Sequence, residues 1–437
     1  MAKKLWGGRF KKEIDIDFFE FQKSIQYDYR LALYDVTHSQ IHILALKDAG
    51  ILTPKEEKKL HFALQEIYTE IKENKFKPNL QSEDIHTEIQ NRVEKKVGKL
   101  ADKLHTLRSR NDQIAFDEKF YCRKQSLEIE KLILEVIKSF LELSRRYIGF
   151  SIVGYTHTQR AQKVDFKDYL GSFVCIFERD RKRCDDFSNK IVASLGSGAF
   201  KGTILTKHYD NALQGIIKKL ALDETIKLQT VENPLEHVSD RDFIVEFLSI
   251  LSILQMHLSR FAEDMILFST QEFNFVDLPE EFCTGSSLMP HKKNPDFLEL
   301  VRGYTGRIYG NLMALLTIMK GLPLTYNRDM QLDKEPLFSS VDIIKDELKI
   351  LARFIKGIKL NEKVIEKALE DESLYTVDLA EYLVKEKKIP FAQAHEIIGK
   401  VIRYAEDNKC KIKDMEDSLL NTFSAHLNHK IIKEIFG

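Results

Sequence analysis

The sequence predicts an all-α protein built from long helices. Apolar residues recur at three- and four-residue steps almost throughout the 437 residues, and no series alternates polar and apolar residues as strands do. Only 19 glycines and 9 prolines occur, about half of the roughly 12% that is usual in globular proteins. Because these residues punctuate turns, their scarcity indicates long elements. No repeat of fixed period is present, so we expect neither a solenoid nor an α/β fold.

The first clear helix begins after Thr53. Thr53 supplies an N-cap, Pro54 the first helical residue and Glu56 the third-position acid of a capping box. Apolar residues follow at helical spacing: Leu60, Ala63, Leu64, Ile67 and Ile71.

Longer apolar patterns with few polar interruptions occupy 132–143, 243–268 and 297–319. They predict helices that are buried on several sides. At about 1.5 Å per residue, a helix of roughly 25 residues runs about 38 Å, and such rods pack most simply as a bundle.

Between these helices lie segments without periodicity. Ser239 with Asp242 resembles a capping box, which would place Arg241 in a first helical turn, a ready anion site. The segment 271–293 is unusually long for a loop and is therefore expected to be functional or disordered. After it, Asn294, Pro295 and Asp296 are expected to begin a helix as N-cap, N1 and N2.

A further break near 359–362 precedes a last helical segment rich in Lys and Glu. We therefore expect three domains: an N-terminal helical domain over 1–107, a central long-helix bundle over 108–360 and a C-terminal helical domain over 361–437.

Charge and cysteine usage exclude several functions. The 67 basic and 67 acidic residues balance, so no global field attracts nucleic acid or an anionic membrane. The N-terminus lacks the apolar stretch of a secretory signal, and no apolar run approaches the ~18 residues of a membrane span. Five scattered cysteines indicate a reducing compartment, so the cytoplasm is expected. The common zinc motifs are missing, so we predict no metal site.

Four polar clusters combine short donors with a cation, an inventory suited to binding carboxylate or phosphate. They are 106–112, 154–162, 285–294 and 326–334. Taken singly, each is more simply a solvated helix cap, and His157 alone is more simply structural. The glycine-rich segment 196–203 is not expected to bind nucleotide, because it reads Lys-Gly-Thr rather than Gly-Lys-Thr and no preceding strand is evident.

The combination of motifs is more specific. Residues 285–294, GSSLMPHKKN, resemble the G-S-S-x-M-P-x-K-x-N signature of the fumarase/aspartase superfamily, whose members eliminate a group from a succinyl substrate to give fumarate or a close analogue. Within that superfamily, further segments resemble the argininosuccinate lyase family. These are 5–10 (LWGGRF), 109–113 (SRNDQ), 154–157 (GYTH), 239–243 (SDRDF) and 326–336 (YNRDMQLDKEP).

This resemblance implies a three-domain, elongated protomer whose central helices form a twenty-helix core in a homotetramer. Each active site would be assembled from three protomers. The implied reaction is the reversible cleavage of argininosuccinate to arginine and fumarate, a step of arginine biosynthesis, without cofactor or metal.

The resemblance also implies catalytic roles. Ser286 would be the general base on a mobile loop, while Lys292 and Asn294 would stabilise the doubly charged aci-carboxylate. His157, oriented by Glu299, would be the acid or proton relay for the leaving guanidine, whose conjugate acid has a pKa above about 12. Which group delivers that proton stays open.

Further matched positions would contact substrate. Carboxylates would be held by Ser109, Arg110, Asn111, Thr156 and Arg241, and the remainder of the molecule by Tyr326, Gln331 and Lys334. Ser24, Asp28 and Asp84 match other substrate contacts.

Some residues depart from the family pattern. Leu107 stands where glycine is usual, so we expect a different backbone angle there, since leucine disfavours positive φ. Val153 and Lys163 replace prolines and would change loop stiffness only. The usual Gly-Gly-Thr-containing tail is absent, which could affect activity if that tail supports a site. Two alternatives stay open: a non-catalytic structural protein like the lens crystallins of the family, and a sister lyase acting on adenylosuccinate, fumarate or aspartate.

Overall fold

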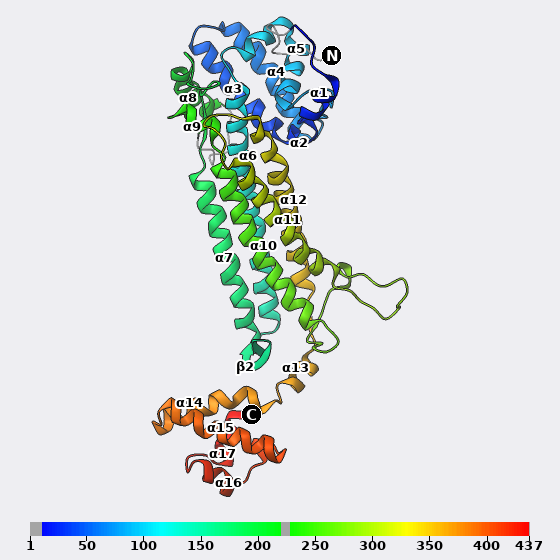
Figure 1. Cartoon of the computed structure of the whole chain (residues 1–437), viewed down its shortest axis with the longest axis vertical. Helices are drawn as coiled ribbons and strands as arrows, with labels where there is room; N and C mark the ends of the chain where they lie inside the picture. Colours follow the sequence, from blue (N-terminus) through cyan, green and yellow to red (C-terminus); the bar gives the residue numbers. More distant parts are fainter. Residues whose placement is uncertain (1–10, 220–227, 437) are drawn as a thin grey trace. The chain divides into compact units, whose positions relative to one another are not determined.

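The structure is a computed structural model that describes residues 11–219 and 228–436 (Figure 1). Long α-helices dominate it, as the apolar period predicts, and all of its described strands are short. The motif at 5–10 lies outside the described residues. The chain divides into two compact units: unit 1 comprises 1–134, 179–256 and 303–348, and unit 2 comprises 135–178, 257–302 and 349–437. The expected domain boundaries near 107 and 360 stay a prediction.

The longest helices have residues in both units. They are α6 (Arg110–Arg146), α7 (Phe166–Lys190), α10 (Asp242–Phe268), α11 (Asp296–Met319) and α12 (Lys334–Gly357). The apolar patterns at 132–143, 243–268 and 297–319 lie within α6, α10 and α11, so those helices are confirmed. The first half of α6 gave no such pattern because several of its buried residues are polar or charged: Asp112, Gln113, Asp117, Glu118 and Arg123.

Unit 1 contains the N-terminal helices. Its elements outside the long helices are α1 (Ile16–Gln22), α2 (Ile25–Asp28), η1 (Tyr29–Leu31), α3 (Ala32–Asp48), α4 (Pro54–Lys72), α5 (Ile85–Val97), η2 (Gly98–His105), β3 (Ala193–Leu195), η3 (Thr206–His208), α8 (Tyr209–Lys219), β4 (Leu228–Thr230), α9 (Pro234–Ser239) and η5 (Arg328–Asp333). Helix α3 is almost wholly buried and packs against α4, α5 and α8. The capping box of α4 is confirmed, since Glu56 N donates to Thr53 Oγ1 at 3.3 Å and Thr53 N donates to Glu56 Oε2 at 2.9 Å.

The expected helix start at Ser239 is wrong. Ser239 ends α9, and its hydroxyl donates to the carbonyl oxygens of Leu235 and Glu236. The cap of α10 comes from Asp240, whose Oδ1 accepts from Asp242 N at 2.9 Å. Arg241 therefore precedes the helix instead of lying in its first turn. Helix α11 likewise begins at Asp296, and Asn294 instead exchanges backbone hydrogen bonds with Thr284.

Unit 2 contains a β-hairpin that the sequence analysis did not expect. Strands β1 (Ser151–Thr156) and β2 (Gln159–Asp165) pair antiparallel, and Val153 lies opposite Lys163. Val153 and Lys163 therefore lie in strands, whereas the sequence analysis had treated both positions as parts of loops. A shorter antiparallel pair joins β5 (Val276–Asp277) to β6 (Lys359–Leu360), at the break expected near 359–362.

The remaining regular elements of unit 2 are helices. It comprises η4 (Glu280–Phe282), α13 (Glu362–Ala368), η6 (Glu372–Tyr375), α14 (Thr376–Lys387), α15 (Phe391–Asn408), η7 (Ile412–Asp414), α16 (Asp417–Phe423) and α17 (His429–Phe436). Buried residues from Leu379 to Ile432 form a hydrophobic cluster of their own.

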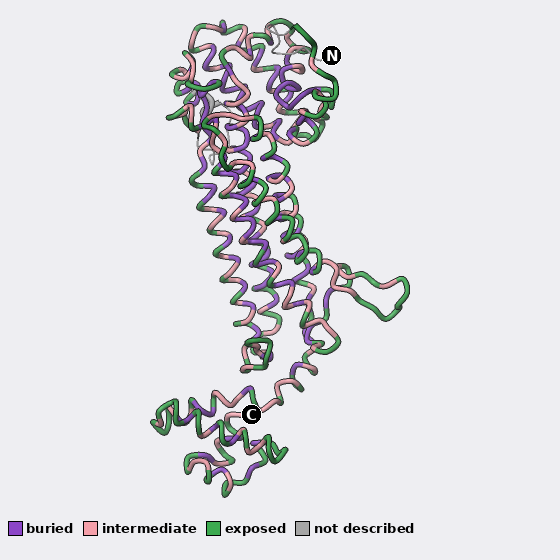
Figure 2. Tube along the Cα trace, in the orientation of Figure 1, coloured by how far each residue is buried: buried purple, intermediate pink, exposed green. Residues whose placement is uncertain are grey.

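Helix α10 is the one described helix that is long and apolar enough to cross a membrane, although the sequence analysis found no apolar run of that length. In its most apolar window of 18 residues, 61% of the residues are buried inside the structure (Figure 2). Packing therefore accounts for its apolar composition, as in the core helix of a bundle.

Candidate active site

Three predicted substrate contacts lie together in unit 1, although they come from separate segments. The Ser24 hydroxyl donates to Asp28 Oδ2 at 2.6 Å, and Asp28 Oδ1 accepts from Ile85 N at 3.1 Å. Asp84, the residue before, caps α5 by accepting from Thr87 N at 2.8 Å. Burial, reinforced by the Asp84 carboxylate, raises the pKa of Asp28 to about 7.

Arg110 joins this group from the start of α6. Its Nε lies 3.1 Å from Asp84 Oδ2, and its Nη2 donates to Thr87 Oγ1 at 2.6 Å. Burial alone would raise the pKa of Asp84, but the Arg110 charge and other partners outweigh burial and lower it. Asp84 thus stays ionised beside a cation.

Gln331 approaches the same segments from η5. Its amide donates to the Gln22 carbonyl oxygen at 2.9 Å. Arg328, which the sequence analysis did not single out, lies 3.4 Å from the Glu83 carboxylate. Glu83 also lies 3.6 Å from Arg110, so it links two cations at the edge of the group. Arg328 falls within the 326–336 motif and Glu83 directly precedes Asp84, but the sequence analysis assigned neither residue a role of its own.

The predicted contacts at 109–111 lie at the start of α6, which is attached to the glycine-rich loop at 196–203. Asn111 N donates to Ser109 Oγ at 3.2 Å, and the Asn111 amide donates to the Ala199 carbonyl oxygen at 3.3 Å. The Asp112 carboxylate accepts from the backbone N–H groups of Gly196 and Ser197 at 3.2 and 3.3 Å.

The glycine-rich loop after β3 therefore binds a carboxylate of its own chain. The sequence analysis found no strand before this loop, but β3 ends at Leu195, directly before Gly196. Gly196 has a φ of 107° and Gly198 a φ of 56°, which glycine tolerates. The start of α6 and the glycine-rich loop are thereby fixed to each other.

Leu107 differs from the expectation. The departure from glycine predicted another backbone angle, yet Leu107 has a φ of 59°, in the left-handed region. Its side chain is 41% exposed. Arg108, the next residue, is buried and donates to Ser39 Oγ at 2.8 Å, which fixes the chain despite the strain.

Arg241 and Lys334 lie in a group of four buried charges, which we call the buried charge ring. Arg241 Nε lies 2.5 Å from Asp333 Oδ2 and 3.2 Å from Glu118 Oε2. Lys334 Nζ lies 2.8 Å from Asp333 Oδ1 and 2.7 Å from Glu118 Oε1. Each cation thus contacts both carboxylates, so Arg241 is not the open anion site that a first helical turn would have provided.

Tyr326 lies near this ring. Burial raises the pKa of its hydroxyl, while the charges of Lys334, Arg328 and Arg241 partly oppose that rise. The Arg241 Nη2 atom is buried without a hydrogen-bond partner. Tyr326 thus lies within electrostatic reach of both cations and of Asp333.

Unit 2 holds the signature loop. The Ser286 hydroxyl oxygen accepts from Leu288 N at 3.2 Å and from Met289 N at 3.0 Å, forming a local turn. Lys292 is exposed, whereas its neighbour Lys293 donates to Asp277 Oδ1 at 2.8 Å. Asn294 ends the loop through its backbone pair with Thr284.

Thr156 and His157 lie at the tip of the hairpin. Thr156 pairs with Gln159, which leaves His157 and Thr158 as a two-residue turn with φ of 53° and 58°. A turn with two positive φ angles favours Asn-Gly, because side chains with a Cβ atom are strained there by roughly 1–3 kcal/mol each. The turn is therefore a local source of backbone strain in unit 2.

Glu299 does not contact His157 among the described residues. It lies in the first turn of α11 and pairs loosely with Arg302, at 3.9 Å. The predicted acid and its orienting partner are thus both exposed and separate within one chain.

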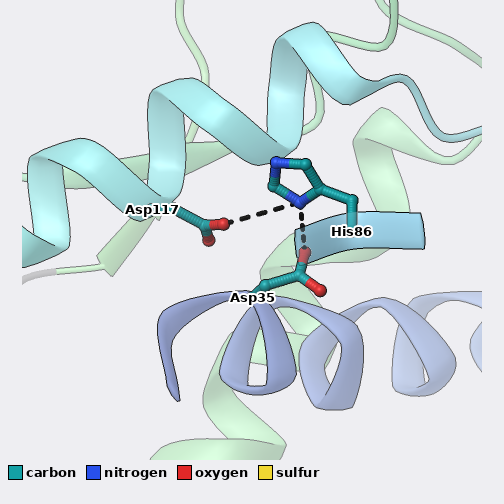
Figure 3. Close-up of side chains that lie close together, drawn as sticks. All are labelled: Asp35, His86 and Asp117. Carbon is teal, nitrogen blue, oxygen red and sulfur yellow. Dashed lines mark hydrogen bonds and ion pairs between the residues drawn. The ribbon is translucent and has the colours of Figure 1, made fainter. Parts of the chain in front are cut away.

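One side-chain cluster in unit 1 has the residue types of a metal site. Asp35, His86 and Asp117 are buried and present ligand atoms within 4.8 Å of one another (Figure 3). His86 Nδ1 lies 2.9 Å from Asp35 Oδ1 and 3.8 Å from Asp117 Oδ2.

Burial and neighbouring charges shift the pKa values of this cluster. Burial and the Asp35 charge raise the pKa of Asp117 well above its usual value. Burial lowers the pKa of His86, but Asp35 outweighs burial and raises it. The buried Arg108 guanidinium adds a further positive charge nearby.

Comparison with known proteins relates the whole chain to one family. Residues 8–310 match a family model described as lyase, and residues 374–437 match one described as argininosuccinate lyase C-terminal. The argininosuccinate lyase of Caldanaerobacter subterraneus is 43% identical over 435 residues, which cover 99% of this chain and 96% of that protein. The argininosuccinate lyase of Geobacter metallireducens is 42% identical over 435 residues, which cover 99% of this chain and 92% of that protein.

Solved structures share the fold at lower identity. A class II fumarase from Schistosoma mansoni has a TM-score of 0.78 at 16% identity, covering 96% of this chain and 91% of that one. An EDDS lyase in complex with formate has a TM-score of 0.76 at 20% identity, and the match covers 96% of this chain and 82% of that one. These likenesses show the helical fold alone.

Proposed function

Since the chain belongs to the argininosuccinate lyase family, we infer that it cleaves argininosuccinate reversibly to arginine and fumarate. The observation that carries this inference is the 43% identity to a curated argininosuccinate lyase over 99% of the chain. The reaction breaks a carbon–nitrogen bond after removal of a weakly acidic proton, so the site must provide a base, an acid and cations for carboxylates.

We assign substrate binding to the group in unit 1. Asp28 and Asp84 offer carboxylates to the cationic part of argininosuccinate, and Gln331 approaches the same segments through its hydrogen bond to Gln22. Ser109, Arg110, Asn111 and Arg241 provide donors for carboxylates of the substrate, and Tyr326, Gln331 and Lys334 bind the remainder of the molecule, which has a carboxylate of its own. The hydrogen bonds that join Ser24, Asp28, Ile85 and Gln22 across distant segments support one binding region.

We assign proton removal to Ser286. Serine is a weak base in water, so this role requires that the loop close over substrate and exclude solvent. In the uncomplexed chain the hydroxyl is occupied by backbone N–H groups of its own loop, and closure would exchange these for substrate. Lys292 and Asn294 would then stabilise the doubly charged intermediate.

We assign delivery of the leaving-group proton to His157, which Glu299 would orient. Thr156 would contact a substrate carboxylate. Because His157 and Glu299 are separate within one chain, we propose that they meet between protomers. A homotetramer with a twenty-helix core and sites shared by three protomers fits this arrangement. We expect the enzyme in the cytoplasm and expect no cofactor.

The test is ultraviolet absorbance of fumarate with argininosuccinate, adenylosuccinate or aspartate as substrate. We expect fumarate from argininosuccinate alone. Ser286→Ala should lower kcat by roughly 10²–10⁴-fold, the usual contribution of general base catalysis. The matched control is His291→Ala, at a variable position of the signature in the same exposed loop, and it should stay within about twofold.

Mixing protomers tests the shared site. A mixture of Ser286→Ala and His157→Asn tetramers should regain partial activity after subunit exchange, with a particle mass of four times 50.9 kDa by light scattering. Absence of recovery despite verified exchange contradicts the shared assembly, while absence of fumarate from the wild type contradicts the function.

A further inference from the structure

The buried charge ring contains two residues to which the proposed reaction gives no role. Glu118 comes from α6, and Asp333 comes from the end of η5. Arg241 precedes α10 and Lys334 begins α12, so the ring joins three helices of unit 1. All four side chains have at most 2% of their surface exposed.

Burial makes the positions of the two cations depend on these carboxylates. Water cannot solvate Arg241 or Lys334 here, so each must be neutralised by protein partners. Glu118 and Asp333 each contact both cations, and the further hydrogen bond from Arg241 goes to the Asp240 carbonyl oxygen at 2.7 Å. Moving one carboxylate would therefore move both cations.

The ring also leaves donor capacity unused. Arg241 Nη2 is buried and has no hydrogen-bond partner, which is costly unless a ligand supplies an acceptor. Lys334 has three N–H donors, and its contacts with Glu118 and Asp333 occupy two. An incoming carboxylate would satisfy both cations at once.

We propose that Glu118 and Asp333 are positioning residues for the lyase reaction, which hold Arg241 and Lys334 where these cations receive a substrate carboxylate. This inference rests on the proposed function. Asp333 reaches both cations from the chain beside Lys334, whereas Glu118 reaches them from another helix. Glu118 therefore decides how the start of α12 is aligned with α6.

The first variant alters position and keeps charge. Glu118→Asp shortens the side chain by one methylene, so the ring stays neutral and the fold is retained while the cations shift. Misplaced carboxylate-binding groups weaken substrate binding, so we expect KM for argininosuccinate to rise and kcat/KM to fall by about 10–100-fold, as for other supporting contacts. Loss of folded enzyme would instead lower kcat and leave KM unchanged.

The second variant removes charge. Glu118→Gln should lower kcat/KM by at least as much as Glu118→Asp. The matched control is Glu347→Gln, because Glu347 is another buried carboxyl, in α12 of the same unit, without an ion-pair partner among the described residues. It should keep kcat/KM within about twofold.

A double-mutant cycle tests whether Glu118 acts through Lys334. Adding Glu118→Asp to Lys334→Gln should lower kcat/KM by less than Glu118→Asp does in the wild type, because one of the two cations that Glu118 positions is already gone. A full additional 10–100-fold loss, or an unchanged KM in Glu118→Asp, overturns the inference and leaves the lyase function intact. A wild type that releases no fumarate overturns both.

Discussion

Leu107 has a backbone conformation that leucine disfavours, and its replacement gives a sharp test of the strain. Its φ of 59° lies in the left-handed region. Leu107 directly precedes the buried Arg108 and lies shortly before the start of α6. The perturbation compares Leu107→Gly with Leu107→Ala. Both remove the leucine side chain, so the difference between them reports the backbone alone.

The magnitude follows from two opposing terms. A residue with a Cβ atom costs roughly 1–2 kcal/mol in the left-handed conformation, a cost that glycine avoids. Glycine loses about 0.5–1 kcal/mol more backbone entropy on folding than alanine. The balance favours glycine at 107 by about 0.5–1 kcal/mol, opposite in sign to an ordinary helical site.

Differential scanning calorimetry is the assay. At about 2.1 cal/mol/K per residue, unfolding 437 residues carries an entropy of about 0.9 kcal/mol/K, so the Tm of Leu107→Gly should exceed that of Leu107→Ala by about 1 °C. The control is Lys59, exposed within α4, where alanine should exceed glycine by about 1 °C. A glycine variant at 107 that melts at or below the alanine variant refutes the strain argument.

Two further predictions concern stability. Burial raises the pKa of Glu347 to about 8, so its favourable contribution is complete below pH 4.5 and is lost as pH rises through about 8. The Tm of Glu347→Gln relative to wild type should therefore increase between pH 5 and pH 9, and a pH-independent difference would contradict this. Tyr209 Oη and the buried His42 Nδ1 lie 2.6 Å apart, so Tyr209→Phe leaves a buried imidazole nitrogen unpaired. This should cost about 1–3 kcal/mol and lower the Tm by about 1–3 °C in the same calorimetric scan, whereas an unchanged Tm would show that the hydrogen bond contributes nothing.

The sequence predicts those helices whose buried side is apolar. Helices α10 and α11 follow from apolar spacing, whereas the first half of α6 has buried polar residues that look like a solvated surface. The hairpin escaped notice because β2 is mostly polar and its turn has His157 and Thr158 where Asn-Gly would have signalled a turn.

The spacing of the motifs identifies candidate site residues, but it does not identify the side chains that these residues contact. Glu118 in a helix is indistinguishable in sequence from a solvent-exposed glutamate, and its contacts are with residues more than a hundred positions away. Arg241 was assigned to an open helix start for the same reason, since only the folded chain shows that Asp333 and Glu118 surround it. Local sequence patterns therefore do not predict ion pairs between residues that are far apart in the chain.

The strained hairpin tip predicts how the protein would respond to artificial evolution. His157 and Thr158 occupy a turn where Asn-Gly would cost less, so selection for heat resistance alone should replace them early. Selection that also requires turnover should retain His157 and gain its stability elsewhere, for instance at Leu107. The hairpin turn is then the place where thermostability and activity compete most directly, and libraries should keep it fixed.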